Sequence, residues 1–70
     1  MTKPTIDSRG TKIWWNSQRE PHREDGPAIL YYDGTKFWYK NGKYHREDGP
    51  AIEYSASGIK HWYINGKFIE

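Results

Sequence analysis

The sequence predicts an all-β fold, a single-layer antiparallel β-meander built of about two and a half hairpin units. Two repeated segments and a set of turns predict it. The hexapeptides GTKIWW, GTKFWY and GIKHWY begin at Gly10, Gly34 and Gly58, 24 residues apart each time. The octapeptide HREDGPAI occupies residues 22–29 and again residues 45–52. The segments between them are rich in β-branched and aromatic residues and end at turn dipeptides, which favours strands over helices.

The strands are expected to form in pairs along the chain. The expected segments are AILYY (28–32), TKFWYK (35–40), AIEYS (51–55) and IKHWYI (59–64), with edge strands at 12–16 and 67–69. Turns are predicted at Asp33-Gly34, Asn41-Gly42 and Asn65-Gly66, because two-residue hairpin turns need residues that tolerate positive φ. Pro27 and Pro50 each follow a glycine and mark the start of a strand, where a missing N–H is harmless.

The spacing of the repeats predicts how the chain is divided. Residues 1–9 are expected to form an N-terminal extension that can be mobile. Residues 10–70 are expected to form one repeat domain, with units at 10–33, 34–57 and 58–70. The repeat spacing changes by one residue in two places, which puts loops at 16–21 and 55–58. Ile69 stands where the pattern expects histidine, so the third unit is incomplete.

The turn lengths predict which residues share a face. A two-residue turn at 33–34 pairs Ile29 with Trp38, and a three-residue loop at 56–58 pairs Ile52 with Trp62 and Glu53 with His61. The constant face is the expected structural core: Trp14, Trp38, Trp62, Ile29, Ile52, Tyr31 and Tyr54, beside Lys12, Lys36 and Lys60. The opposite, varying face is the expected surface for a partner or a dimer contact, and it carries Leu30, Phe37, Tyr39, Glu53 and His61.

The composition predicts a small aromatic core. Only 34% of the residues are hydrophobic, but 17% are aromatic, and each aromatic ring buries a large area. There is no cysteine to supply a disulfide, so a homodimer is expected to stabilise the fold.

Charge and hydropathy restrict the partners. The net charge of +2 is too small to indicate nucleic acid by electrostatics alone. No apolar run resembles a signal peptide or a membrane span, so a cytoplasmic location without a membrane partner is expected.

The charged half of the octapeptide, HRED, is the sharpest candidate for function. Its two copies are His22, Arg23, Glu24, Asp25 and His45, Arg46, Glu47, Asp48. These residue types can hold metals or exchange protons, but a metal needs three or four converging ligands. A structural interpretation needs less, because aspartate before glycine favours a turn and arginine can bridge a carboxylate of the adjacent repeat. We therefore expect a structural role first, a partner surface second, and a metal or catalytic role last.

No enzyme, cofactor or metal site is expected elsewhere. There is no cysteine, and the serines stand in expected loops without a histidine placed by a catalytic motif. A small meander also offers little concavity from which to exclude water. The tryptophan and lysine face leaves one alternative open, a nucleic-acid-binding module, because interleaved aromatic and basic side chains can stack on bases.

The repeat resembles the MORN repeat and its bacterial variants. The resemblance is carried by the pattern G-x-K-x-W-Y-x-NGK-x-H, is best seen in WYKNGKYHREDGPAIEYSASG (38–58), and covers residues 10–70. It implies β-hairpin units that stack into an elongated sheet. The HRED stretch departs from the family, because MORN units usually carry glycine there.

The wording NGK-x-HREDGPA is similar to repeats in short proteins of bacteria and tailed phages. This resemblance implies a non-enzymatic protein-binding module, in the host cytoplasm if phage-encoded. A concrete version is a small protein that binds and inhibits a host protein, such as a CRISPR-type defence factor or a regulatory factor. Antitoxin-like and assembly roles are further alternatives. The candidate partner-binding residues are His22, Arg23, Glu24, Asp25, His45, Arg46, Glu47, Asp48, Glu53, His61, Phe37 and Tyr39.

Overall fold

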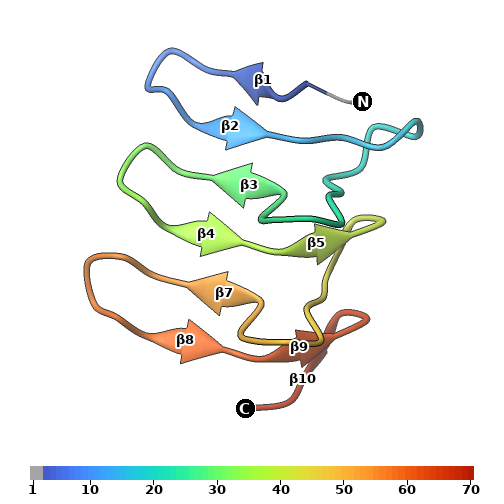
Figure 1. Cartoon of the computed structure of the whole chain (residues 1–70), viewed down its shortest axis with the longest axis vertical. Helices are drawn as coiled ribbons and strands as arrows, with labels where there is room; N and C mark the ends of the chain where they lie inside the picture. Colours follow the sequence, from blue (N-terminus) through green and yellow to red (C-terminus); the bar gives the residue numbers. More distant parts are fainter. Residues whose placement is uncertain (1–2) are drawn as a thin grey trace.

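The computed structural model describes residues 3–70, and all of their regular structure is β. Within these residues, ten short strands follow one another along the chain (Figure 1). They are β1 (Thr5–Ile6), β2 (Lys12–Ile13), β3 (Ile29–Leu30), β4 (Lys36–Phe37), β5 (Tyr39–Lys40), β6 (Lys43–Tyr44), β7 (Ile52–Glu53), β8 (Lys60–His61), β9 (Tyr63–Ile64) and β10 (Lys67–Phe68). None of the described residues forms a helix that could cross a lipid bilayer.

Six of these strands form one antiparallel sheet in the order β1-β2-β3-β4-β7-β8. The pairs β5–β6 and β9–β10 form two separate hairpins, and they continue β4 and β8 beyond the main sheet (Figure 1). The prediction of an all-β antiparallel fold is therefore confirmed.

The loop between β3 and β4 is longer than predicted. Tyr31 N–H donates to Thr35 O at 2.9 Å, and Gly34 N–H donates to Tyr31 O at 3.0 Å. Gly34 has a φ of 92°, so the loop is a three-residue connection made of a type I turn followed by a left-handed residue. The predicted two-residue turn at Asp33-Gly34 is wrong.

This loop length shifts the register of the sheet. The observed pairs are Ile29 with Phe37 and Ile52 with His61, whereas the predicted pairs are Ile29 with Trp38 and Ile52 with Trp62. The second hairpin slips because its loop spans residues 55–58, as the repeat spacing predicts, and not residues 56–58, on which the predicted pairing was based. A slip of one residue exchanges the two faces of one strand relative to its neighbour.

The main sheet therefore has two faces that differ from the predicted ones. The row Thr5, Ile13, Ile29, Phe37, Ile52 and His61 crosses one face, which we call the aromatic face. The row Ile6, Lys12, Leu30, Lys36, Glu53 and Lys60 crosses the other. Trp14, Trp38 and Trp62 each follow a lysine by two residues and share that second face, which we call the tryptophan face. The predicted core set is thus divided between the two faces. The three tryptophans lie on the tryptophan face, and the other members lie on the aromatic face: Ile29, Ile52, Tyr31 and Tyr54.

The core contains Ala28 and Ala51, which are fully buried, and two large side chains on the aromatic face. Phe37 is 8% exposed and Ile52 is 5% exposed. Phe37, predicted as a partner contact, is therefore a core residue. Its ring centroid lies 5.2 Å from that of Tyr31, 6.0 Å from that of Tyr44 and 6.1 Å from that of Tyr54.

The two outer hairpins contribute rings to the same cluster. Tyr44 on β6 lies 4.6 Å from Tyr39 and 4.9 Å from Tyr63, centroid to centroid. Phe68 on β10 lies 5.5 Å from Tyr63 and 5.8 Å from His61. A continuous set of ring contacts thus joins the main sheet to both hairpins, which explains how a chain with few aliphatic residues fills its interior.

The outer hairpins turn where the sequence predicts. Asn41 and Gly42 have φ values of 52° and 81°, and Asn65 and Gly66 have values of 50° and 80°. In the first unit the corresponding turn contains one more residue, since Asn16 N–H donates to Glu20 O at 2.9 Å. This is the insertion predicted at 16–21.

The sheet begins and ends at other strands than predicted. β1 lies inside the segment predicted as an extension, and it pairs with β2. Trp15 Nε1 also donates to Thr5 Oγ1 at 2.9 Å. β2 has a partner on each side, so the predicted edge at 12–16 is wrong, and the edges of the main sheet are β1 and β8.

The substitution Phe37→Ala tests the corrected core. It is expected to lower the free energy of unfolding by about 3 kcal/mol or to unfold the chain, because a buried ring is replaced by a cavity. Urea denaturation followed by circular dichroism measures the change. Tyr32→Ala is the control, since Tyr32 is 60% exposed and should cost under ~0.5 kcal/mol. Equal effects of the two substitutions would contradict the assignment.

Candidate functional site

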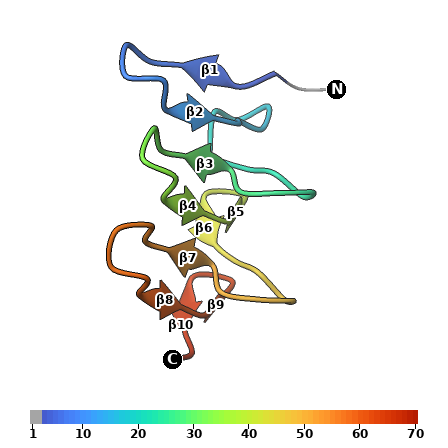
Figure 2. The same ribbon diagram turned by 60° about the vertical axis from the view of Figure 1, so that its left-hand side comes forward.

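The two HRED segments project from the same side of the molecule as long loops (Figure 2). We call residues 22–27 the first HRED loop and residues 45–50 the second. Each loop begins at a histidine whose backbone bonds that of a tryptophan. It ends just before an alanine whose backbone bonds the same tryptophan. In the second unit, His45 N–H donates to Trp38 O at 3.0 Å and Trp38 N–H donates to Ala51 O at 2.7 Å.

The arginine of each loop stacks on that same tryptophan. The guanidinium carbon of Arg23 lies 3.9 Å from the ring centroid of Trp14, and that of Arg46 lies 3.8 Å from the ring centroid of Trp38. Such a contact contributes ~0.5 to ~2 kcal/mol, with the larger values where water is excluded. The arginine side chains are only 27% and 23% exposed, so both stacks are partly shielded.

Hydrogen bonds fix the guanidinium in place. Arg46 Nε donates to Asp48 Oδ1 at 3.1 Å, and Arg46 Nη1 donates to Pro50 O at 3.1 Å and to Glu53 Oε2 at 3.1 Å. Arg23 makes the equivalent bonds to Asp25 and to Pro27 O, at 3.0 Å and 3.3 Å. The arginines therefore close their own loops, rather than bridging to the adjacent repeat as the sequence suggested.

Glycine completes each stack on the side away from the indole. A Cβ added at Gly49 would lie 2.8 Å from Arg46 Cζ, and one added at Gly26 would lie 3.0 Å from Arg23 Cζ. The Gly49 distance is shorter than real Cβ contacts and the Gly26 distance is tighter than nearly all of them, so a larger residue would displace the guanidinium. The glycine of HREDGPAI therefore permits a close approach of the arginine side chain to the backbone.

The histidines tie each repeat to the next. Asn41 N–H donates to His22 Nδ1 at 2.9 Å, and Asn65 N–H donates to His45 Nδ1 at 3.0 Å. Because Nδ1 accepts in both bonds, the proton of each neutral ring is on Nε2. That nitrogen faces a glutamate, with His45 Nε2 3.4 Å from Glu47 Oε2. Nδ1 is thus occupied and is not free to hold a metal.

The carboxylates of the loops remain outside. Glu24 and Asp25 are 77% and 86% exposed, and Glu47 and Asp48 are 80% and 88% exposed. Each loop therefore turns its basic and imidazole groups toward the scaffold and its acidic groups toward solvent. Ion pairs at such exposure contribute little to stability.

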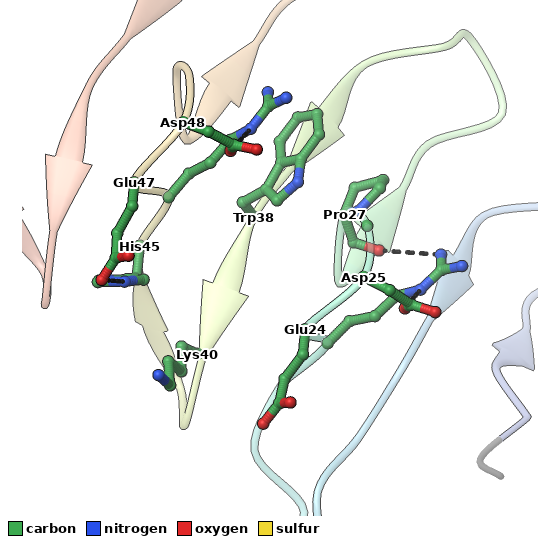
Figure 3. Close-up of a pocket in the computed structure, with 11 residues that line it drawn as sticks. Glu24, Asp25, Pro27, Trp38, Lys40, His45, Glu47 and Asp48 are labelled. Atoms are coloured by element: carbon green, nitrogen blue, oxygen red, sulfur yellow. Dashed lines mark hydrogen bonds and ion pairs between the residues drawn. The ribbon is translucent and has the colours of Figure 1, made fainter.

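A groove of about 740 Å³ lies between the two loops (Figure 3). Glu24 and Asp25 stand on one side, and Glu47 and Asp48 on the other. Trp38 and Lys40 lie between them. A smaller groove repeats the arrangement one unit earlier, beside Trp14, Asn16 and the first HRED loop.

The groove gathers only part of the predicted partner surface. It is lined by Arg23, Glu24, Asp25, His45, Arg46, Glu47 and Asp48, while His22 lines the smaller groove. Tyr39 and His61 belong to the ring cluster of the aromatic face. Glu53 lies opposite Lys60 and not opposite His61 as predicted, and it bonds Arg46 instead.

Sequence reasoning missed four residues that line this groove. Trp38 is predicted as a core residue but lines the groove, because the predicted register exchanged the faces. Gly26, Pro27 and Lys40 also line it. The signal for the glycines was present in the sequence, since each arginine precedes a glycine by three residues in both copies.

Titration and ligand geometry restrict the chemistry of this region. Burial, with the adjacent Tyr44 hydroxyl as the next cause, raises the pKa of Tyr39 well above its usual value. Its phenol is therefore neutral at physiological pH. Across residues 3–70, no three or more His, Asp or Glu side chains converge in a way that could hold a metal ion.

No protein family, curated protein or solved structure compared with this chain matches it. The resemblance to MORN repeats stays a prediction.

The substitution Gly49→Ala tests the arginine stack. The added methyl is expected to displace Arg46 and lower the free energy of unfolding by about 1 to 2 kcal/mol, through the lost cation–π contact and hydrogen bonds. The same substitution in an Arg46→Ala background should cost under ~0.5 kcal/mol, because the displaced group is already gone. Urea denaturation of the four variants gives the coupling. Equal costs in both backgrounds would show that the stack is not what the glycine serves.

Proposed function

We propose that the chain is a non-enzymatic protein-binding module that uses the groove between its two HRED loops. The observation that carries this proposal is the preorganisation of the loops. Each is fixed by a stacked arginine, a histidine bond to the next repeat and a close-packed glycine. A surface that is already ordered loses less conformational entropy when it binds.

The lining of the groove suits a protein better than a small substrate. Trp38 gives the groove an aromatic wall, and tryptophan is enriched among the residues that dominate binding energy at interfaces. The exposed carboxylates on both sides favour a partner with basic side chains and discourage one with phosphates. Among residues 3–70, those that line the groove include no nucleophile paired with a base.

A narrower proposal follows from the resemblance alone. A small bacterial or phage protein of this type would bind and inhibit a host protein, with a CRISPR-type defence factor or a regulatory factor as the concrete version. The homodimer also stays a prediction. Its contact would be the aromatic face, where Tyr31, Tyr54 and Phe68 are 42%, 40% and 57% exposed.

A charge reversal tests the groove. The double variant Glu24→Lys/Glu47→Lys leaves the arginine stacks intact, because neither glutamate bonds an arginine. In an affinity pull-down from host lysate, this variant is expected to lose the protein that the wild type retains. Ser8→Lys is the control, a change at an exposed residue that lies outside the groove. Retention of the same protein by the double variant would refute the groove as the binding surface.

Nucleic-acid binding is the second candidate, because three lysines and three tryptophans share the tryptophan face. Two observations weigh against it. The rings of Trp14 and Trp38 are already stacked on arginines, and Glu53 interrupts the lysine row between Lys36 and Lys60.

A titration with oligonucleotides distinguishes the two functions. Single- and double-stranded oligonucleotides at low and moderate salt are expected to give no saturable change in fluorescence anisotropy. Saturable binding that weakens steeply with salt would favour nucleic acid, because such binding depends on counterion release.

A further inference from the structure

Each HREDGPAI segment docks onto the strand that precedes it, in the same way in both units. We call residues 22–30 and 45–53 the donor segments. Each makes four contacts with one strand and the tryptophan that follows it: two backbone bonds to the tryptophan, an arginine stack on its ring, and antiparallel pairing along the strand. In the first unit, His22 N–H donates to Trp14 O at 2.9 Å and Trp14 N–H donates to Ala28 O at 2.8 Å. Arg23 covers the ring, and β3 pairs with β2.

The second unit repeats these contacts. The two backbone bonds of Trp38 go to His45 and Ala51, Arg46 covers the ring, and β7 pairs with β4. The strand is therefore an acceptor, and it recognises an extended segment through backbone bonds and one cation.

The third unit contains the same acceptor with a different cover. We call Lys60 to Tyr63 the third acceptor. Trp62 N–H donates to Glu70 O at 2.8 Å, and Ile69 N–H donates to Trp62 O at 2.8 Å. These bonds replace those of alanine and histidine. Among residues 3–70, no guanidinium stacks on Trp62, and β8 is paired on one side only.

We propose that the third acceptor binds an extended donor-type segment of a partner protein. Such a segment carries an arginine that stacks on Trp62 and, six residues further on, the start of a strand that pairs with the free edge of β8, as in the two donor segments. The occupant is argued from the two equivalent sites of the same molecule, which both hold this segment. Addition of a strand to an open sheet edge is a common mode of peptide recognition.

The present cover of the third acceptor is only two residues long. Ile69 is 53% exposed, and residues 69 and 70 contribute two backbone bonds to Trp62. A donor segment would form the same two bonds and would add the stack on Trp62 and the pairing with β8. The proposal does not depend on the groove, because neither β8 nor Trp62 lines it.

A peptide with the sequence HREDGPAIEY, residues 45–54 of this chain, tests the proposal. Titrated into the ¹⁵N-labelled full chain, it is expected to bind saturably and to shift the amide signals of Lys60 to Tyr63 and of residues 69 and 70. The peptide with alanine in place of its arginine is expected to bind about 3-fold to 30-fold more weakly, which is the range of a cation–π contact. A scrambled peptide of the same composition is the control for charge.

A cycle with the protein variant Trp62→Leu identifies the ring. Against this variant, the arginine and alanine peptides should bind equally, because the stack is gone for both. If the variant does not fold, as judged by circular dichroism, the two peptides against the wild type still decide the matter. No saturable binding, equal binding of both peptides to the wild type, or shifts confined to the groove would each overturn the proposal.

The same spectra identify the occupant. Shifts of Lys60 to Tyr63 on dilution without peptide, together with a dimer in light scattering, would assign the acceptor to a second copy of this chain and overturn the proposal of a separate partner.

Discussion

The contact between arginine and tryptophan is the interaction on which the loops and the groove depend. The chain leaves its strand after His45 and returns at Ala51, and both ends of this excursion are held by the backbone of Trp38. A long excursion from a strand would be costly to order unless something filled it. Arg46 fills it, because its guanidinium lies between the indole and Gly49 and bonds the loop carboxylate and carbonyl.

The two faces of the sheet are stabilised by different kinds of side-chain contact. The aromatic face holds a ring cluster around Phe37, which provides burial that the few aliphatic residues cannot. The tryptophan face holds the stacked arginines, which use the apolar surface of the indoles while keeping charge at the surface. A chain of two-residue strands is thus held by side chains on both faces, with no second layer required.

Sequence reasoning predicted the architecture but not the register. Repeat spacing located the loops, because a one-residue insertion must leave the paired strands, and the Asn-Gly turns have the positive φ values that their residue types predict. The Asp33-Gly34 turn failed because glycine also serves as the left-handed last residue of a three-residue loop. The dipeptide Asp33-Gly34 is compatible with both a two-residue turn and a three-residue loop. One extra loop residue exchanged Phe37 with Trp38, so the predicted core and the predicted partner surface traded members.

The residues of the octapeptide fall into two groups with different roles, and the sequence alone does not distinguish them. Its histidine and arginine side chains face the scaffold, where each has a fixed partner, and its glycine lies against the arginine. Its glutamate and aspartate side chains face solvent. The sequence alone could not assign these roles, since alternation along a strand does not apply in a loop closed by its own arginine. Copying the scaffold residues from unit to unit therefore also copies the carboxylates. The stacking of the repeats sets the distance between the carboxylates of the two loops. A partner that contacts both loops at once must therefore match that distance.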